Sequence, residues 1–275
     1  MDTKRLKGWA RVFLPFFSLL LIPLLCQADD IEGPRSLGLG SAYTAIADGA
    51  DAVRVNPAGI AAKRIYSTTV SYQKTDSDNN AVNATIIDYK TTNSPVGISY
   101  TEKELTGNKR KFGILSVAGS APRSLIGLSA KYFWDELLDK EDYSYDAGIL
   151  LFPYKGLTIG TVGKNLKKTD FTHVHKSYSA GIAYRFSPSI EASVDYTKDE
   201  DVSGDDKIKA FGLEYALKKD IIARGGFTRN EISDIDYYSL GFTLHSSKLS
   251  LEYGYRWDKE DKNNNIQGFS ACFYF

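Results

Sequence analysis

The sequence predicts an all-β protein: a transmembrane antiparallel β-barrel of about 14 strands that encloses a short N-terminal plug, or hatch, segment. Three observations support this fold class. Segments of about ten residues alternate apolar and polar side chains from Ile65 to the end of the chain. The connections between these segments alternate between long and short, and the chain ends on an aromatic strand.

The first 28 residues form a predicted signal peptide. A basic start is followed by an apolar run from Val12 to Leu25 and by the small residue Ala28, which is the three-part plan of a secretory signal. A membrane-spanning helix is the alternative, but such a helix needs about 20 apolar residues, and this run is shorter and contains Pro15 and Pro23. We therefore expect cleavage near Ala28 and export of the rest of the chain.

The composition excludes several classes of function. Lysine and arginine together number 34, as do aspartate and glutamate, so no net charge attracts nucleic acid. Without the signal peptide, Cys272 is the only cysteine, and no internal disulfide can form. His173 and His175 are close in sequence, but no third or fourth metal ligand is evident and no catalytic nucleophile motif occurs. We expect no enzyme activity, no cofactor and no metal.

Residues 64–275 are expected to form the barrel. Every second residue between Leu249 and Trp257 is apolar, and the residues between them are small, polar or charged. Such alternation fits a soluble sandwich or a membrane barrel whose apolar face meets lipid. The odd-numbered connections, such as residues 164–176 and 198–206, are long and polar, whereas the even-numbered ones are short. This pattern favours an outer-membrane barrel, in which long loops face the outside and short turns face the periplasm.

The other face of the predicted strands carries charges of both signs, which a barrel directs into its lumen. These charges can pair with one another, or they can line a polar conduit that selects a solute, and the sequence leaves both interpretations open. The predicted lumen-facing charges are Lys131, Asp146, Arg185, Glu191, Asp195, Glu214, Arg224, Glu252 and Arg256.

The last strand has an aromatic ending. Phe269, Phe273 and Phe275 share one face by strand periodicity. This ending resembles the C-terminal signal by which the barrel assembly machinery recognises bacterial outer-membrane barrels. The expected location is therefore the outer membrane of a Gram-negative-type cell, with outer-membrane lipid against the barrel wall.

Residues 29–63 form the expected hatch. Ser41 is a predicted N-cap of a short helix that Gly49 ends, and Asn56 with Pro57 predicts a second helix that Gly59 stops. Many small residues allow the backbone to approach a surrounding wall closely. The segment is therefore compact enough for a narrow space.

The stretch "RSLGLGSAYTAIADGADAVRVNPAGIA", residues 35–61, resembles the N-terminal motif of the FadL-like outer-membrane proteins, particularly their PorV/PorQ-like branch. The resemblance implies a fourteen-stranded barrel with a hatch folded inside its lumen. The chain has no room for the large outside loops of the fatty-acid transporters, and only Gly225 and Gly226 suggest a kink of the kind that marks a lateral opening. The hatch-motif positions that match are Gly38, Gly40, Asp48, Asp51, Asn56, Pro57 and Gly59.

The same resemblance implies passive uptake of small solutes, hydrophobic ones among them, past the hatch. The alternative is a PorV-like structural or secretion-partner barrel with a closed lumen and no transport. A hydrophobic small molecule and an exported protein are the corresponding candidate partners.

Overall fold

The computed structural model describes residues 31–77, 79–105, 108–200 and 207–275. The predicted signal peptide, residues 1–28, lies outside the described residues. Within these described ranges, no helix is long and apolar enough to cross a membrane.

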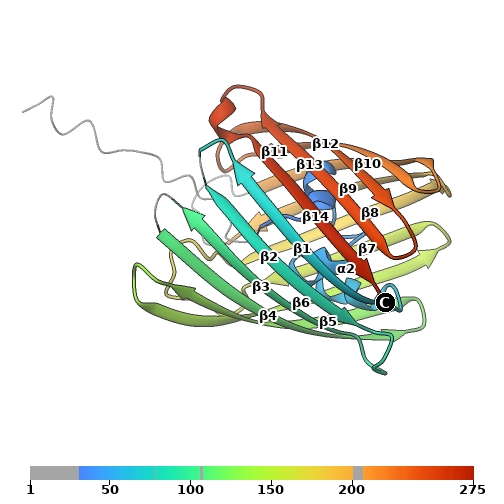
Figure 1. Cartoon of the computed structure of the whole chain (residues 1–275), viewed down its shortest axis with the longest axis horizontal. Coiled ribbons are helices and arrows are strands. Elements are labelled where there is room, and N and C mark those ends of the chain that lie inside the picture. Colours follow the sequence, from blue (N-terminus) through green and yellow to red (C-terminus); the bar gives the residue numbers. More distant parts are fainter. Residues whose placement is uncertain (1–30, 78, 106–107, 201–206) are drawn as a thin grey trace, which may run out of the picture.

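Fourteen antiparallel strands form one closed barrel, in which each strand pairs with its sequence neighbours and β1 pairs with β14 (Figure 1). This confirms the predicted fold class. Closure pairs the backbone groups of every strand on both sides, which the hydrocarbon of a membrane requires. The strands are β1 (Tyr66–Thr75), β2 (Asn80–Asp88), β3 (Val96–Leu105), β4 (Asn108–Ala121), β5 (Ser124–Asp135), β6 (Lys140–Tyr154), β7 (Leu157–Lys164), β8 (Ser177–Ser187), β9 (Ile190–Asp199), β10 (Lys207–Lys218), β11 (Ile221–Asn230), β12 (Ile235–His245), β13 (Leu249–Asp258) and β14 (Ile266–Tyr274).

Alternation along each strand separates the two faces of the barrel wall. In β9, Val194 and Tyr196 point outward and are 55% and 41% exposed, whereas Ser193 and Asp195 point inward and are buried. Large apolar side chains recur on the outer face all around the barrel. This apolar face is the one that lipid covers in outer-membrane barrels.

The strand register shifts after Leu151, Arg185 and Ala216, in each case next to a short turn. At Gly225 and Gly226, by contrast, β11 pairs with both neighbouring strands without interruption. The predicted kink at these glycines is therefore wrong. Gly226 faces inward, where its missing side chain makes room for the N-terminal residues inside the barrel.

The two ends of the barrel differ. We call the end that carries the β1–β2 connection and the other odd-numbered connections the long-loop end. The opposite end is the short-turn end, and it also holds the C-terminus (Figure 1). The connection of residues 165–176, between β7 and β8, folds into the lumen, where Phe171 and Val174 are buried. One predicted short turn is longer than expected, since residues 89–95 join β2 to β3.

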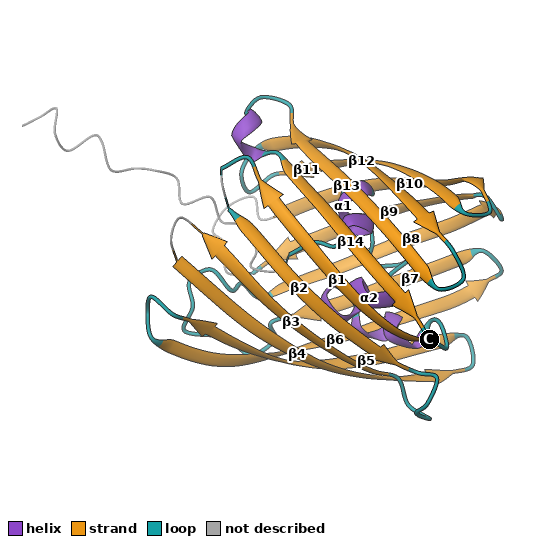
Figure 2. Ribbon diagram, viewed as in Figure 1, coloured by secondary structure: helices purple, strands orange, loops and turns teal. Residues whose placement is uncertain are grey.

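Residues 31–63, which we call the lumenal segment, lie inside the barrel (Figure 2). The segment contains α1 (Pro34–Gly38), α2 (Gly49–Val55) and the 3-10 helix η1 (Pro57–Ala61); a second 3-10 helix, η2 (Lys262–Asn264), lies between β13 and β14. α1 packs against β11–β14, α2 against β1–β4, and η1 against β4–β6. The segment therefore touches most of the barrel wall.

The local helix predictions for this segment are partly wrong. Ser41 has a φ of 67° and caps no helix, because its backbone adopts the left-handed conformation. The first helix starts earlier, at Pro34, where the fixed φ of proline suits the first helical position. Gly49, with a φ of 60°, begins α2 and does not end a helix.

The prediction for the second helix is confirmed at its start. The Asn56 side chain accepts a hydrogen bond from the Ala58 N–H (3.2 Å), and Pro57 takes the first helical position. Gly59 lies within η1 and does not stop it. An added Cβ at Gly59 would lie 2.2 Å from the Ala47 carbonyl oxygen, so this glycine is needed for close packing.

Candidate functional site

The lumenal segment meets the barrel wall through a belt of inward-facing glycines. An added Cβ at Gly226 would lie 2.3 Å from the Gly40 nitrogen, and one at Gly148 would lie 2.0 Å from the Asn56 side-chain oxygen. The segment and the wall therefore approach closely on both sides of the lumen. The glycine belt, in which an added Cβ would come within 3.0 Å of the segment, consists of Gly97, Gly127, Gly148, Gly160, Gly212, Gly226, Gly241 and Gly254.

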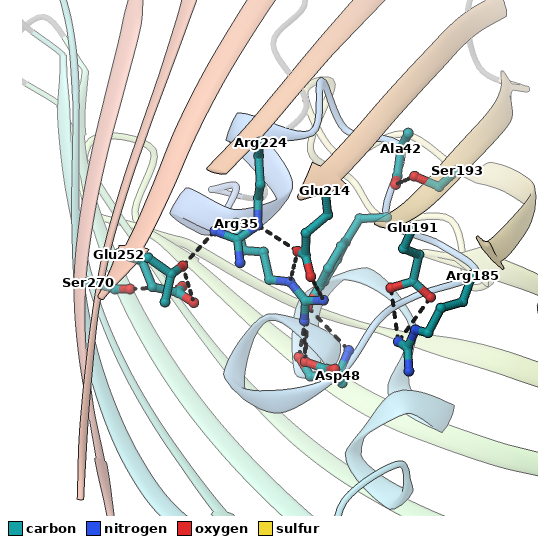
Figure 3. Close-up of polar contacts among 12 residues, drawn as sticks. Arg35, Ala42, Asp48, Arg185, Glu191, Ser193, Glu214, Arg224, Glu252 and Ser270 are labelled. Carbon is teal, nitrogen blue, oxygen red and sulfur yellow. Dashed lines mark hydrogen bonds and ion pairs between the residues drawn. The ribbon is translucent and has the colours of Figure 1, made fainter. Parts of the chain in front are cut away.

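Polar side chains of the wall hold the middle of the segment by its backbone. One carboxylate oxygen of Asp195 accepts hydrogen bonds from the Tyr43 and Thr44 N–H groups (2.9 and 2.6 Å). The Ser193 hydroxyl donates to the Ala42 carbonyl (2.6 Å; Figure 3). Asp195, one of the predicted lumen-facing charges, thus binds the segment directly. Its carboxylate accepts hydrogen bonds from two backbone N–H groups that would otherwise be buried without a partner.

Arg35 of α1 links the segment to the wall through ion pairs (Figure 3). Its guanidinium contacts Asp48 of the same segment (2.5 Å) and Glu214 of β10 (3.1 Å), and Arg224 of β11 reaches the same Glu214 oxygen at 2.7 Å. Burial alone would raise the pKa of the Asp48 carboxyl. The nearby Arg35 and Lys63 cations outweigh burial and hold this pKa well below its usual range, so Asp48 stays ionised.

Arg54 and Arg256 anchor the two halves of the segment. Arg54 is almost fully buried and contacts Asp51 in the next turn (2.5 Å) and Asn83 of β2 (2.5 Å). Arg256 of β13 pairs with Glu32 and also donates to the Ser41 hydroxyl (2.7 Å). Arg54 therefore joins α2 to the wall by a charge-assisted hydrogen bond, and Arg256 joins the start of the segment to the wall by an ion pair.

The remaining predicted lumen charges also find partners inside the barrel. Lys131 and Asp146 form a fully enclosed pair at 2.8 Å between β5 and β6. Arg185 contacts both carboxylate oxygens of Glu191 (3.0 Å) near the short-turn end. Glu252 accepts a hydrogen bond from the Ser270 hydroxyl (3.2 Å; Figure 3). All nine predicted charges occupy inward-facing positions. Their contacts favour the interpretation that these charges pair inside the protein over the interpretation that they line a polar conduit.

Three cavities border the lumenal segment. The outer chamber, about 220 Å³, lies at the long-loop end beside Glu32, Gln73 and Arg256. The inner polar chamber, about 330 Å³, lies at the short-turn end beside Arg35, Thr69 and Glu252. The inner wide chamber, about 900 Å³, also lies at the short-turn end, between the segment and β6–β8. The segment thus separates one outer cavity from two inner cavities.

Apolar side chains fill the lumen between the long-loop end and the inner wide chamber. Near the long-loop end, Phe171 packs edge-on against Phe133 with ring centroids 6.4 Å apart. The same buried cluster continues through Tyr43 and Ile46 of the segment. Toward the short-turn end, Leu150 and Phe152 line the inner wide chamber together with Ile46. We call the side of the lumen along β2–β8 the apolar half because it contains this cluster, although buried polar side chains such as Asn83 and Lys131 also lie there. The side along β9–β14 and β1 is the polar half.

The C-terminal aromatic residues lie on the outer face or at the end of the barrel. Phe269 and Phe273 point outward and are 48% and 45% exposed. Phe275 follows β14, donates its N–H to the Tyr66 carbonyl (3.0 Å) and packs edge-on against the Tyr66 ring. These contacts extend the pairing between the first and last strands by one residue.

His173 and His175, in the loop between β7 and β8, contact different residues. The His173 ring stacks near Phe171 with centroids 5.2 Å apart, while the His175 Nδ1 lies 4.0 Å from Asp199. In the part of the chain that the structure describes, no three His, Cys, Asp or Glu residues gather where they could hold a metal ion.

Sequence reasoning missed the glycine belt and the anchoring roles of Arg35 and Arg54. A signal for the belt existed, because Gly127 pairs directly with Gly148, and Gly241 with Gly254, on inward positions of neighbouring strands. Paired inward glycines remove side-chain volume from the lumen and indicate that another backbone fills it.

The fold is similar to those of solved outer-membrane proteins. No protein-family model and no curated protein matches the sequence. The CymD monoaromatic hydrocarbon channel aligns with a TM-score of 0.66 and 12% identity, over 89% of this chain and 97% of that one. The toluene transporter TbuX of Ralstonia pickettii aligns with a TM-score of 0.61 and 11% identity, over 88% and 97%.

The outer-membrane protein Omp33 of Acinetobacter baumannii is a further structure with a similar fold, with a TM-score of 0.51 and 8% identity, over 77% of this chain and 98% of that one. At such identities the likeness establishes the fold alone. The chain therefore has the fold of the β-barrels of Gram-negative outer membranes.

Proposed function

We propose that this chain is an outer-membrane transport barrel that admits small solutes, hydrophobic ones among them, past the lumenal segment acting as a hatch. The observation that carries this proposal is the position of residues 31–63, which fill the lumen of a closed barrel between an outer and two inner cavities. A polypeptide that only stabilised the wall would need no cavity on either side.

The apolar half offers the route for a hydrophobic solute. Side chains from Phe171 through Ile46 to Phe152 form an apolar column that ends in the inner wide chamber. A small apolar solute gains free energy by leaving water for such surroundings, at about 25 cal/mol per Å² of apolar surface. The fold that this chain shares with CymD and TbuX, a hydrocarbon channel and a toluene transporter, supports the FadL-like part of the resemblance.

We also propose that the mature chain begins near Ala28 and that Phe269, Phe273 and Phe275 form the signal for the barrel assembly machinery. Outward exposure of Phe269 and Phe273 supports this role, because a recognition factor reaches them before the barrel is surrounded by lipid. Replacing the three residues with alanine should leave the chain unassembled in the periplasm, which fractionation measures.

A reversible lock on the hatch tests the transport proposal. An added Cβ at Gly97 of β3 would lie 2.7 Å from the Val53 side chain of α2, so the double variant Val53→Cys/Gly97→Cys, made with Cys272→Ser, brings two thiols together across the segment and the wall. Oxidation should stop the uptake of radiolabelled toluene by cells that carry the barrel, and reduction should restore it.

The single variants, treated in the same way, are the control for oxidation itself. Equal toluene uptake in the oxidised and reduced double variant, with the disulfide demonstrated on a gel, would contradict a moving hatch. No uptake above cells without the barrel, in either state, would contradict the transport proposal as a whole.

A further inference from the structure

The inner face of β1 carries a column of enclosed polar groups that have no hydrogen-bond partner within the described part of the chain. Thr69, Ser71 and Gln73 are spaced two residues apart and therefore point the same way. Among the described residues, the Thr69 and Ser71 hydroxyls and the Gln73 side-chain oxygen find no hydrogen-bond partner, although all three atoms are enclosed. Buried polar groups in native proteins are almost always hydrogen-bonded, to protein or to ordered water.

This polar column lies between two of the cavities. Thr69 lines the inner polar chamber at the short-turn end, and Gln73 lines the outer chamber at the long-loop end. Ser71 lies between them and is 3% exposed, with Ser270 directly opposite on β14. The distance from residue 69 to residue 73 is about 13 Å at the usual rise of a strand.

We propose that the polar half of the lumen holds a file of water along Thr69, Ser71 and Gln73, and that this file conducts water and small uncharged hydroxylated solutes past the lumenal segment. Water bound to the three groups would supply the hydrogen bonds that the protein does not. A small polyol can replace this water because its hydroxyls donate and accept in the same way. This goes beyond the proposed function, since it concerns another class of solute and the other half of the lumen.

The charges around the column disfavour ions. Among the residues that the structure describes, the outer chamber is lined by two cations, Lys103 and Arg256, and two anions, Glu32 and Asp199. The inner polar chamber is lined by equal numbers of cations and anions: Arg35, Lys63, Arg185 and Arg224 against Asp48, Asp51, Glu214 and Glu252. Neither chamber concentrates ions of one sign, and the column between them offers only neutral dipoles to an ion that must shed water. Neutral solutes are therefore the class that fits.

Osmotic shrinkage of proteoliposomes measures this conduction. Glycerol should enter liposomes that contain the barrel about tenfold faster than empty liposomes, while glucose should enter no faster, because a single file of water admits only a narrow solute. The variant Ser71→Leu should return glycerol entry to the rate of empty liposomes. Thr68→Leu is the matched control, since Thr68 lies on the outer face of the same strand, and it should keep the rate of the unaltered protein.

Two results would overturn the proposal: glycerol entry no faster than in empty liposomes, or full entry through Ser71→Leu. Heat-modifiable migration on gels checks that each variant is folded. This test measures glycerol entry, so a failure of toluene uptake does not affect it. A failure of glycerol entry likewise does not affect the test of toluene uptake.

Thiol accessibility provides a second measurement that does not depend on flux. In a Cys272→Ser background, Ser71→Cys should react with a small methanethiosulfonate reagent about tenfold faster than Ser129→Cys, because a thiol ionises and reacts in contact with water. Ser129 is a matched site: it faces inward on β5 and is 4% exposed, but its hydroxyl pairs with Ser116 at 2.7 Å. Equal and slow reaction at both sites would also overturn the water file.

Discussion

The same lumenal segment fills the two halves of the lumen in different ways. In the apolar half, α2 and η1 pack with the inward loop of residues 165–176 into one hydrophobic cluster, and the polar groups that occur there are mostly paired inside the protein. In the polar half, α1 is held by ion pairs with Glu214 and, through its neighbour Glu32, with Arg256, and cavities remain above and below it. The difference teaches that one segment can be joined to a barrel wall by apolar packing on one side and by ion pairs on the other.

Breaking the enclosed pair in the apolar half should have the largest effect on stability. Lys131→Met leaves the Asp146 carboxylate buried without its cation, and we expect the free energy of unfolding to fall by about 3–5 kcal/mol. Urea unfolding in detergent micelles, followed by tryptophan fluorescence, measures this. Adding Asp146→Leu should recover most of the loss.

The matched substitution in the polar half is Arg256→Met, which should cost only about 1 kcal/mol, because its partner Glu32 lines the outer chamber and stays hydrated. An equal loss in both halves would contradict the distinction between a fully enclosed ion pair and one that borders a cavity.

Adding a side chain to the glycine belt should have the next largest effect on the free energy of unfolding. In Gly127→Val the new Cβ would lie 2.3 Å from the Ala58 nitrogen, so the segment cannot seat, and overpacking of this kind costs about 1–3 kcal/mol. Planar-bilayer recordings should show raised ion leakage through the unseated lumen.

Gly113→Val is the control for the glycine belt, because an added Cβ at Gly113 meets nothing within 4 Å. Its unfolding free energy and leakage should match those of the unaltered protein. If Gly127→Val were as tight and as stable as Gly113→Val, close backbone packing would not be what seats the segment.

A smaller effect distinguishes the serines of the two halves. Ser116→Ala removes a hydroxyl that pairs with Ser129, and should cost about 1 kcal/mol of unfolding free energy. Ser71→Ala removes a hydroxyl with no protein partner among the described residues, and should change this free energy by about 0 kcal/mol. The same urea titration measures both, and equal losses would show that Ser71 has a protein partner after all.

Lowering the pH from about 7 to about 5 should have the smallest effect on the contribution of Asp48, because its carboxyl stays ionised over this range. Because Arg35 and Lys63 hold the pKa of Asp48 below its usual 3.8, the ionised carboxyl stabilises the fold above that value, and this contribution is lost only as the pH falls through the lower folded pKa. The contribution of Asp48 should therefore be constant between about pH 7 and about pH 5, and Asp48→Asn should change ion leakage by the same factor at both pH values. Increased leakage at pH 5 that Asp48→Asn abolishes would show that Asp48 titrates higher than its contacts imply.

The sequence identified the barrel because period-two alternation reports directly on the two faces of a strand. It also indicated an inward position for each charge from Lys131 to Arg256, since inward and outward residues differ by one position only. Alternation says nothing about which inward charges meet. The pairing of Lys131 with Asp146 and of Glu214 with Arg35 depends on the register of neighbouring strands and on the path of the segment.

The lumenal segment was harder to predict in detail because the wall determines its conformation. Ser41 satisfies the usual rule for a helix cap, yet its hydroxyl accepts a hydrogen bond from Arg256 and its backbone is left-handed. Gly225 and Gly226 satisfy the usual rule for a kink, yet Gly226 serves close approach to Gly40. Local rules fail at both places because the partner is more than a hundred residues away in the chain.

The attachment of the segment also gives any movement a direction. Ile31 lies beside the outer chamber, whereas the other end of the segment passes through residues 62–65 straight into β1 at the short-turn end. Four extended residues span at most about 14 Å, so this tether is short. A movement of residues 31–61 as one body would therefore pivot about the short-turn end and would have to break the contacts of Glu32 and Ser41 with Arg256. Extraction through the long-loop end would first have to pull this tether through the length of the barrel.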